Sequence, residues 1–202
     1  MNSSTLLHFI QKNNFRFLTF NDILPLYKGK SSAASRALLH LTRYGLLTKI
    51  KRGVWVNNSA ADFRLEEILP AVVSPWPAYL SLHSALSEYG LIAEIPQVIY
   101  AVSLYKASRI ISKMGNMILC QMPEKYFWGY RTKRINKSLI PIADPEKAIL
   151  DTLYLSWTKR SPIQMPVFRE KPHIDIKKLK QYAKKWNHKA VINYANNFNK
   201  MT

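Results

Sequence analysis

The sequence predicts an α+β fold with two domains, an N-terminal one of residues 1–60 and a mixed α/β C-terminal one of residues 61–202. Two observations predict it. Stretches with helical apolar spacing occur beside short extended runs, with turn residues between them, and the charge balance changes near residue 60. A chain of 202 residues, 48% of them apolar and 21% charged, is long enough to bury a core without metal or disulfide staples.

The first 60 residues carry the signals of three short helices followed by a hairpin. Serine, asparagine or aspartate stands before each helix and can cap it. The candidate caps are Ser3/Ser4, Asn21/Asp22 and Ser31/Ser32. We expect helices up to about Lys12, over Ile23–Tyr27 and over Ala33–Tyr44, an extended link over Phe15–Phe20, and strands over Leu46–Ile50 and Val54–Asn57. Gly45 is expected to end the third helix, and a tight turn joins the two strands.

This order of elements predicts a winged helix-turn-helix. The third helix supports the prediction because, at about 100° per residue, Ala34, Leu38 and Leu41 share one face. The opposite face carries Ser32, Arg36, Leu39 and Arg43, with Ser35 and His40 beside it. A helix that enters the major groove of DNA needs this division between an apolar inner side and a polar outer side.

The polar side of the third helix and the basic hairpin form the candidate DNA-binding site. Short side chains near the start of the helix let its backbone approach DNA, and arginine can pair with guanine or hold phosphate. Basic hairpin residues would follow the backbone or the minor groove. The candidate residues are Ser31, Ser32, Ser35, Arg36, His40, Arg43, Lys49, Lys51 and Arg52. Binding through phosphates predicts an affinity that falls steeply with salt.

The net charge of +18 is unevenly distributed and predicts a polyanionic partner. Residues 1–60 hold nine Lys or Arg and one acidic residue, and residues 171–202 hold eight Lys and one acidic residue. The 110 residues between them are nearly balanced, with thirteen basic and ten acidic residues. Two basic regions therefore flank a nearly neutral middle.

The C-terminal domain is expected to mix helices with a small sheet. Helix signals occur at Phe63–Leu69, at Leu80–Tyr89 before Gly90, from Asp144 through Leu155, and in a Lys-rich helix over Ile176–Trp186 that another helix can follow. Strand signals occur at Val98–Leu104, Met117–Met122 and Tyr126–Tyr130. Arg131–Lys137 is expected to be a basic segment that leads to Leu139–Ala143. The Lys-rich helix could add phosphate contacts or meet an acidic protein, and the sequence leaves both open.

No catalytic or metal-binding motif is found, so no enzyme, cofactor or metal site is expected. The six glycines lack the spacing of a phosphate loop, and the five histidines are scattered beside a single cysteine. One group of residues would suit a metal-dependent nuclease, namely Asp144, Glu146, Lys147 and Asp151. Capping of a helix start by Asp144-Pro145-Glu146 is the simpler interpretation.

Aromatic residues beside basic ones offer a further alternative, the stacking of single-stranded nucleic acid. The aromatic residues are Tyr126, Phe127, Trp128 and Tyr130. Alternating aromatic residues on a strand more often belong to a core, and we expect that role here.

A cytoplasmic location is expected. The first 19 residues lack the basic and apolar regions of a secretory signal, and no apolar run reaches about 18 residues, so no membrane partner is expected. The single cysteine, Cys120, allows no intramolecular disulfide, which fits a reducing compartment.

Three blocks of the sequence resemble those of the AbiEi-family antitoxins. Arg36–Trp55 (RALLHLTRYGLLTKIKRGVW) resembles the winged helix of that family. Tyr79–Leu91 (YLSLHSALSEYGL) resembles its second block, and Ile142–Asp151 (IADPEKAILD) resembles a later block. The blocks occur in the family's order and span most of residues 1–155, whereas the chain beyond Ser161 matches no block.

The resemblance implies the antitoxin of a bacterial type IV toxin–antitoxin or abortive-infection pair. Such a protein binds and represses its own promoter through the winged helix. Because one winged helix covers only a short site of double-stranded DNA, we expect two or more copies on repeated half-sites. The C-terminal domain of such a protein is associated with neutralising a nucleotidyltransferase-like toxin, without a stable complex being required. The nine candidate residues above would correspond to the recognition helix and wing. The alternatives are a protein-interaction module that binds an acidic partner and a metal-dependent nuclease.

Overall fold

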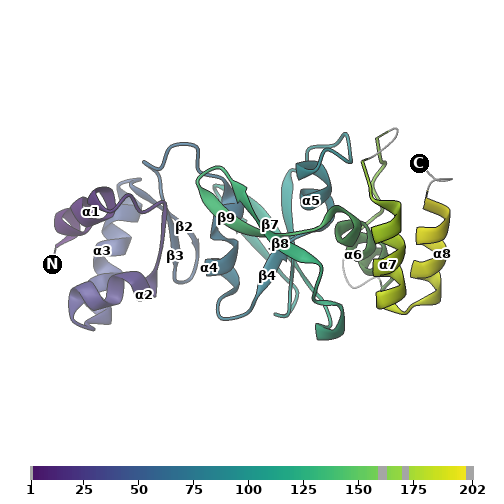
Figure 1. Ribbon diagram of the computed structural model, residues 1–202. Coiled ribbons are helices and arrows are strands. Elements are labelled where there is room, and N and C mark those ends of the chain that lie inside the picture. Colours follow the sequence, from purple (N-terminus) through teal and green to yellow (C-terminus); the bar gives the residue numbers. More distant parts are fainter. Residues whose placement is uncertain (1, 159–162, 170–172, 199–202) are drawn as a thin grey trace. The chain divides into compact units, whose positions relative to one another are not determined.

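A computed structural model describes residues 2–158, 163–169 and 173–198 (Figure 1). The chain has an α+β fold with two compact units. The first unit comprises the chain up to Val72 together with Ile110–Gly115, and the second comprises Val73–Arg109 and the chain from Asn116 on. The predicted domain boundary at residue 60 falls inside the first unit.

The first unit contains helices packed with a three-stranded antiparallel sheet (Figure 1). Its helices are α1 (Ser3–Lys12), α2 (Phe20–Ile23), the 3-10 turn η1 (Leu24–Tyr27) and α3 (Ser31–Arg43). Its strands are β1 (Phe17–Thr19), β2 (Leu47–Lys51) and β3 (Val54–Asn57), in the order β1-β3-β2. The buried faces of α1 and α3, including Leu6, Ile10 and Leu38, form one core with Leu18 and Trp55 of the sheet.

Several local predictions for this unit need correction. The extended link at 15–20 contains β1, which pairs with β3 and makes the hairpin a three-stranded sheet. The second helix begins earlier than predicted because Thr19, and not Asn21 or Asp22, forms its capping box with Asp22. The segment that follows is 3-10 helix, with Pro25 in its first turn.

The predicted serine caps are also wrong. The side chain of Asn2 caps α1 by accepting the Thr5 amide, so Ser3 and Ser4 lie inside the helix. Residue Lys30 occupies the N-cap position of α3 without a side-chain cap bond, and Ser31 and Ser32 are the first helical residues. The hydroxyls of these two serines are therefore not used to cap the helix.

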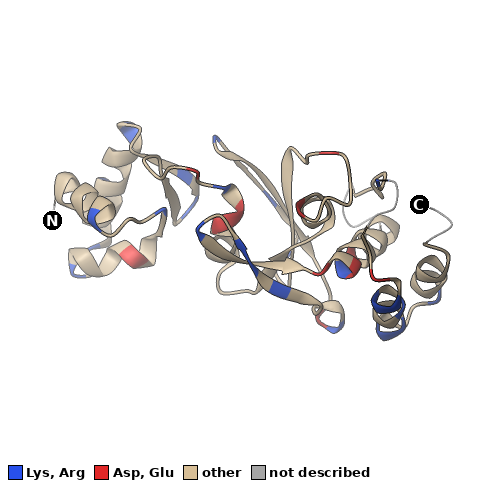
Figure 2. Ribbon diagram, turned by 45° about the horizontal axis from the view of Figure 1, so that its top comes forward, with Lys and Arg blue, Asp and Glu red and all other residues tan. Residues whose placement is uncertain are grey.

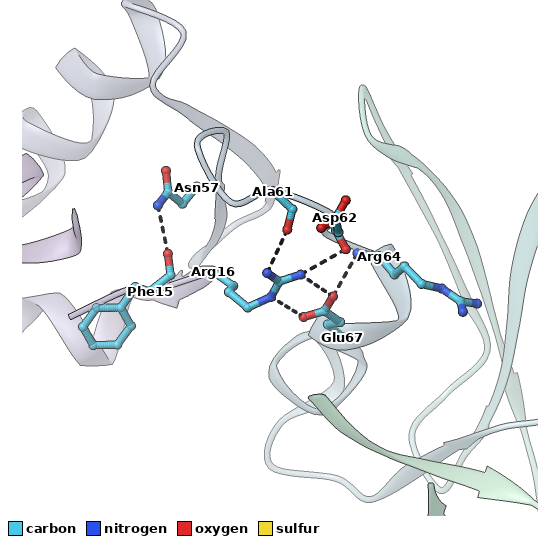
Figure 3. A network of polar contacts seen from close by, with 7 residues as sticks. All are labelled: Phe15, Arg16, Asn57, Ala61, Asp62, Arg64 and Glu67. Atoms are coloured by element: carbon cyan, nitrogen blue, oxygen red, sulfur yellow. Dashed lines mark hydrogen bonds and ion pairs between the residues drawn. The ribbon is translucent and has the colours of Figure 1, made fainter. Parts of the chain in front are cut away.

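A guanidinium fastens the chain beyond residue 60 to the first unit (Figure 3). Arg16 donates to both carboxylate oxygens of Glu67, at 2.7 and 2.8 Å, and to the carbonyls of Ala61 and Asp62. The Glu67 carboxylate is fully buried and also accepts the Arg64 amide at 3.0 Å. The 3-10 turn η2 (Leu65–Ile68) and all but the last residue of α4 (Leu69–Val73) belong to the first unit, and these bonds connect the start of that segment to Arg16, the residue before β1.

The chain that follows this segment forms a six-stranded mixed sheet in the order β6-β7-β5-β4-β9-β8. The strands are β4 (Ala78–Leu80), β5 (Val98–Ser103), β6 (Ser108–Ser112), β7 (Gly115–Gln121), β8 (Tyr130–Ile135) and β9 (Ser138–Ala143). Strands β4, β6 and β9 were not predicted, and the basic segment after residue 130 is the edge strand β8. Charged side chains on an edge strand discourage pairing with other chains.

The helices of the second unit are arranged around α6 (Figure 1). They are α5 (Leu82–Glu88), the 3-10 turn η3 (Glu124–Tyr126), α6 (Pro145–Thr158), α7 (Ile176–Trp186) and α8 (Lys189–Asn197). As predicted, Asp175 caps α7, and a further helix follows it. The predicted strand Tyr126–Tyr130 is wrong, because the chain turns through η3 and through Gly129, whose φ is +73°.

Candidate nucleic-acid interface

The α3 helix has the two sides that its sequence predicts. Ala34 and Leu38 are fully buried and Leu41 is nearly so, whereas Arg36 and Arg43 are exposed. The burial of the apolar side holds the helix in the first unit and leaves its polar side open to a partner.

A groove of about 770 Å³ lies between one side of α3 and the β2–β3 hairpin. Its lining residues are Phe20, Ser31, Ser35, Leu39, Thr42, Lys49, Arg52, Gly53 and Trp55. The groove brings together Ser31 and Ser35 of the helix with Lys49 and Arg52 of the hairpin, four residues that the sequence placed in one site. Ser32, Arg36 and Arg43 are exposed on the next sector of the same helix, at about 100° per residue.

Four basic side chains of α3 and the hairpin are available to bind a partner. In the stretches that the structure describes, no side-chain hydrogen bond or ion pair engages Arg36, Arg43, Lys49 or Arg52. The stretch from Ile23 to Ala61 contains seven Lys or Arg and no Asp or Glu (Figure 2). The positive potential of the helix and the hairpin is therefore not cancelled by acidic residues of the same stretch.

Lys51 is placed differently from the prediction. Its side chain is half-buried, and its ammonium donates to the carbonyl of Val72. Residues two apart on a regular strand point to the same side, but the pairing of β2 with β3 shifts between Lys49 and Lys51. This irregularity re-aims one side chain relative to the other, so Lys49 lines the groove and Lys51 fastens the hairpin to α4.

His40 also lies apart from the groove. Its ring centroid is 4.6 Å from that of Tyr44, and both residues line a second hollow, of about 310 Å³, with the start of α1. The nine predicted residues therefore divide into a groove set, an adjacent exposed set of Ser32, Arg36 and Arg43, and two residues, His40 and Lys51, that lie elsewhere.

Five lining residues of the groove were absent from the predicted site, namely Phe20, Leu39, Thr42, Gly53 and Trp55. The position of Leu39 could have indicated its role, because it follows Ser35 by four residues and therefore lies on the same side of the helix. The sequence offered no comparable signal for Phe20 and Trp55, which reach the groove from α2 and β3.

Two of the carboxylates considered for a nuclease site, those of Asp144 and Glu146, form ion pairs with basic side chains. The ammonium of Lys178 lies 3.1 Å from carboxylate oxygens of both Asp144 and Glu146. Asp144 also accepts the Tyr182 hydroxyl at 2.8 Å and lies 3.5 Å from Arg131. A lysine of α7 thus holds the two carboxylates at the start of α6, and the hydrogen bonds and carboxylate attraction raise the pKa of Lys178 against the opposing effect of burial.

Lys147 and Asp151 form an ion pair inside the second unit, and both side chains are fully buried. Asp151 accepts the hydroxyls of Ser81 at 2.7 Å and Tyr79 at 3.2 Å, and Lys147 donates to the Tyr79 hydroxyl at 3.0 Å. Burial lowers the pKa of Lys147 and raises that of Asp151. Within the described residues, no three His, Cys, Asp or Glu side chains gather in a way that could hold a metal ion.

The aromatic residues near position 128 pack mainly against their own unit. Tyr126 is buried and stacks on Trp186, with ring centroids 4.6 Å apart and an interplanar angle of 16°. Tyr130 stacks on the buried Tyr79 at 4.6 Å. Tyr126 therefore serves the core as expected, whereas Phe127 and Trp128 are half-buried and Tyr130 is exposed.

Comparison with protein-family models finds no match to this chain, and comparison with curated proteins finds none either. The resemblance to AbiEi-family antitoxins remains an expectation from the sequence blocks. Among the helices that the structure describes, none has both the length and the apolar character needed to cross a membrane.

Proposed function

We propose that this protein is a DNA-binding repressor that acts as the antitoxin of a type IV toxin–antitoxin pair in the cytoplasm. The observation that carries the DNA-binding part is the groove in which Ser31 and Ser35 of α3 meet Lys49 and Arg52 of the hairpin. The order of helices and strands in the first unit supports its interpretation as a winged helix-turn-helix.

In this proposal α3 enters the major groove of double-stranded DNA. Arg36 and Arg43 project from its exposed side, where an arginine pairs with guanine or holds phosphate. Lys49 and Arg52 of the hairpin contact the flanking backbone, and the first-turn serines allow a close approach. Lys51 and His40 have supporting roles, since one fastens the hairpin to α4 and the other packs on Tyr44.

The antitoxin part rests on the three sequence blocks. The second unit would neutralise a nucleotidyltransferase-like toxin, and the proposal does not require direct contact with it. One winged helix covers a short site, so specific repression calls for two or more copies on repeated half-sites.

The test is a binding titration on the DNA upstream of the gene and on a scrambled duplex, at two salt concentrations. We expect tighter binding to the upstream DNA at both salts. Arg36→Ala should weaken operator binding by about 1–3 kcal/mol and relax selectivity if the arginine contacts a base. Lys113→Ala is the matched control, because it removes one exposed cation from the same unit, at the turn between β6 and β7.

The second candidate function is a protein-interaction module for an acidic partner. The α7 helix favours it, because Leu179, Ala183 and Trp186 are buried while Lys177, Lys180 and Lys184 are exposed along the other side. Equal binding to both duplexes that is lost at the higher salt would contradict sequence-specific repression and favour this candidate. Co-expression with the product of a neighbouring gene, scored as rescue of growth, tests the antitoxin part separately.

A further inference from the structure

The exposed side of α3 carries one large apolar side chain among its polar ones. Leu39 is 49% exposed, and Arg36 and Arg43 lie three residues before and four residues after it. The side chain has no role in the core formed by Leu38 and Leu41 on the buried side, so its apolar surface is open to a partner.

Thr42 adds a second apolar group next to Leu39. Its hydroxyl donates to the carbonyl of Leu38 at 2.7 Å, so its hydrogen-bonding group is used within the helix and its methyl group remains for a partner. Leu39 and Thr42 line the same groove as the rings of Phe20 and Trp55. The groove therefore joins an apolar stretch to the polar and basic groups of Ser31, Ser35, Lys49 and Arg52.

DNA offers one apolar group on the base edges of its major groove, the C5-methyl group of thymine. Phosphates and the other base atoms are matched by arginine, lysine and serine, but they offer leucine no favourable contact. We propose that Leu39, with the methyl group of Thr42, is a specificity-determining contact to a thymine methyl group in the operator. This inference rests on the proposed function, because it requires α3 to lie in the major groove.

The experiment removes the methyl group from the DNA and the side chain from the protein in turn. Each thymine of the upstream site bound by the wild-type protein is replaced singly by deoxyuridine, which keeps all hydrogen-bonding groups. At one or two positions the affinity should fall about fourfold, the effect of losing the burial of one methyl-sized group. Leu39→Ala should weaken binding to the thymine-containing site and be insensitive to deoxyuridine at those same positions.

Tyr44→Ala is the matched control variant. Tyr44 is 70% exposed at the end of the same helix and lines the second hollow with His40. This variant should keep the wild-type sensitivity to deoxyuridine, and circular dichroism with a thermal melt checks that both variants are folded. Leu39 is exposed, so its truncation opens no cavity in the core.

The outcomes separate the inference from the function on which it rests. Operator preference with a sensitivity to deoxyuridine that Leu39→Ala abolishes supports the thymine contact. Operator preference in which no thymine position depends on Leu39 overturns the contact and leaves the repressor proposal intact. If the wild-type protein prefers no DNA sequence, the repressor proposal fails, and the thymine contact fails with it.

Discussion

Lys147 and Asp151 lie four residues apart on α6, with both charges removed from solvent. Three aromatic rings surround the ammonium, with their centroids 4.6 Å (Trp186), 5.2 Å (Trp128) and 5.4 Å (Tyr79) away. The sequence offered these residues as possible nuclease groups, but it could not show that their charges are satisfied inside the unit. Removing one partner of such a buried ion pair strongly lowers the free energy of unfolding, because the remaining charge stays in an apolar environment.

Asp151→Asn should therefore lower the free energy of unfolding by about 3–5 kcal/mol, because it leaves the Lys147 charge buried without its carboxylate. Lys147→Met alone should also destabilise the protein. The double variant removes both charges and keeps an amide for Ser81 and Tyr79, so its loss should be smaller than the sum of the two single losses. Chemical denaturation of the three variants checks this, and additive losses would show that the two charges are not coupled.

Among the elements, those with strong local signals were predicted and those defined by distant pairing were not. The periodicity of α3, the Asp175 cap of α7 and the proline at the start of α6 are all readable within a few residues. Strands β1 and β4 have three residues each, too few for an alternating pattern, and they exist because β3 and β5 pair with them. The sequence Tyr126–Tyr130 has aromatic residues typical of a strand, but Tyr126 lies in the 3-10 turn η3 and packs on Tyr154 of α6 and Trp186 of α7.

Gly129 belongs to the turn between η3 and β8, and its replacement by alanine gives a testable prediction. Its φ is +73°, and a Cβ there would lie 3.1 Å from the buried Lys147 side chain and 3.2 Å from Tyr182. Gly90, at the end of α5, has a φ of +68° and open space around the same position. Both Gly→Ala changes should cost about 1–2 kcal/mol from backbone strain, and Gly129→Ala should cost about 1–3 kcal/mol more from crowding.

Denaturation curves of Gly129→Ala and Gly90→Ala, measured side by side, check the comparison. Because both glycines lie in the second unit and have similar positive φ angles, the difference between the variants reports mainly the crowding. Equal losses would mean that the chain around Lys147 adjusts without cost, and that the packing there is looser than the structure indicates.

On the scale of the whole molecule, the charge of +18 is shared by both units. The first unit holds eleven Lys or Arg against four acidic residues, and the second holds nineteen against eight. Phosphates are the same in every DNA sequence, so the charge by itself supplies affinity and salt dependence without selectivity. Selectivity has to come from the few side chains that reach base edges.

A triple variant tests this division. Changing Lys177, Lys180 and Lys184 to Gln removes three exposed cations from α7 and leaves its buried face unchanged. Affinity for operator and for scrambled DNA should change by the same factor, so that their ratio stays constant across salt concentrations. A ratio that falls in the triple variant would place α7 at a sequence-dependent contact and would contradict the assignment of selectivity to α3.

The sequence by itself determined the α+β class, the two sides of α3, and the basic charge of the helix and hairpin. These properties follow from composition and from the local spacing of apolar residues. Only the tertiary structure decided which basic residues share a groove. Lys49 and Lys51 are equivalent in an alternating pattern, yet the shifted pairing between them separates their side chains. The Arg16–Glu67 bond likewise joins residues far apart in the chain. Register and long-range partners depend on how segments pack, and no local pattern encodes them.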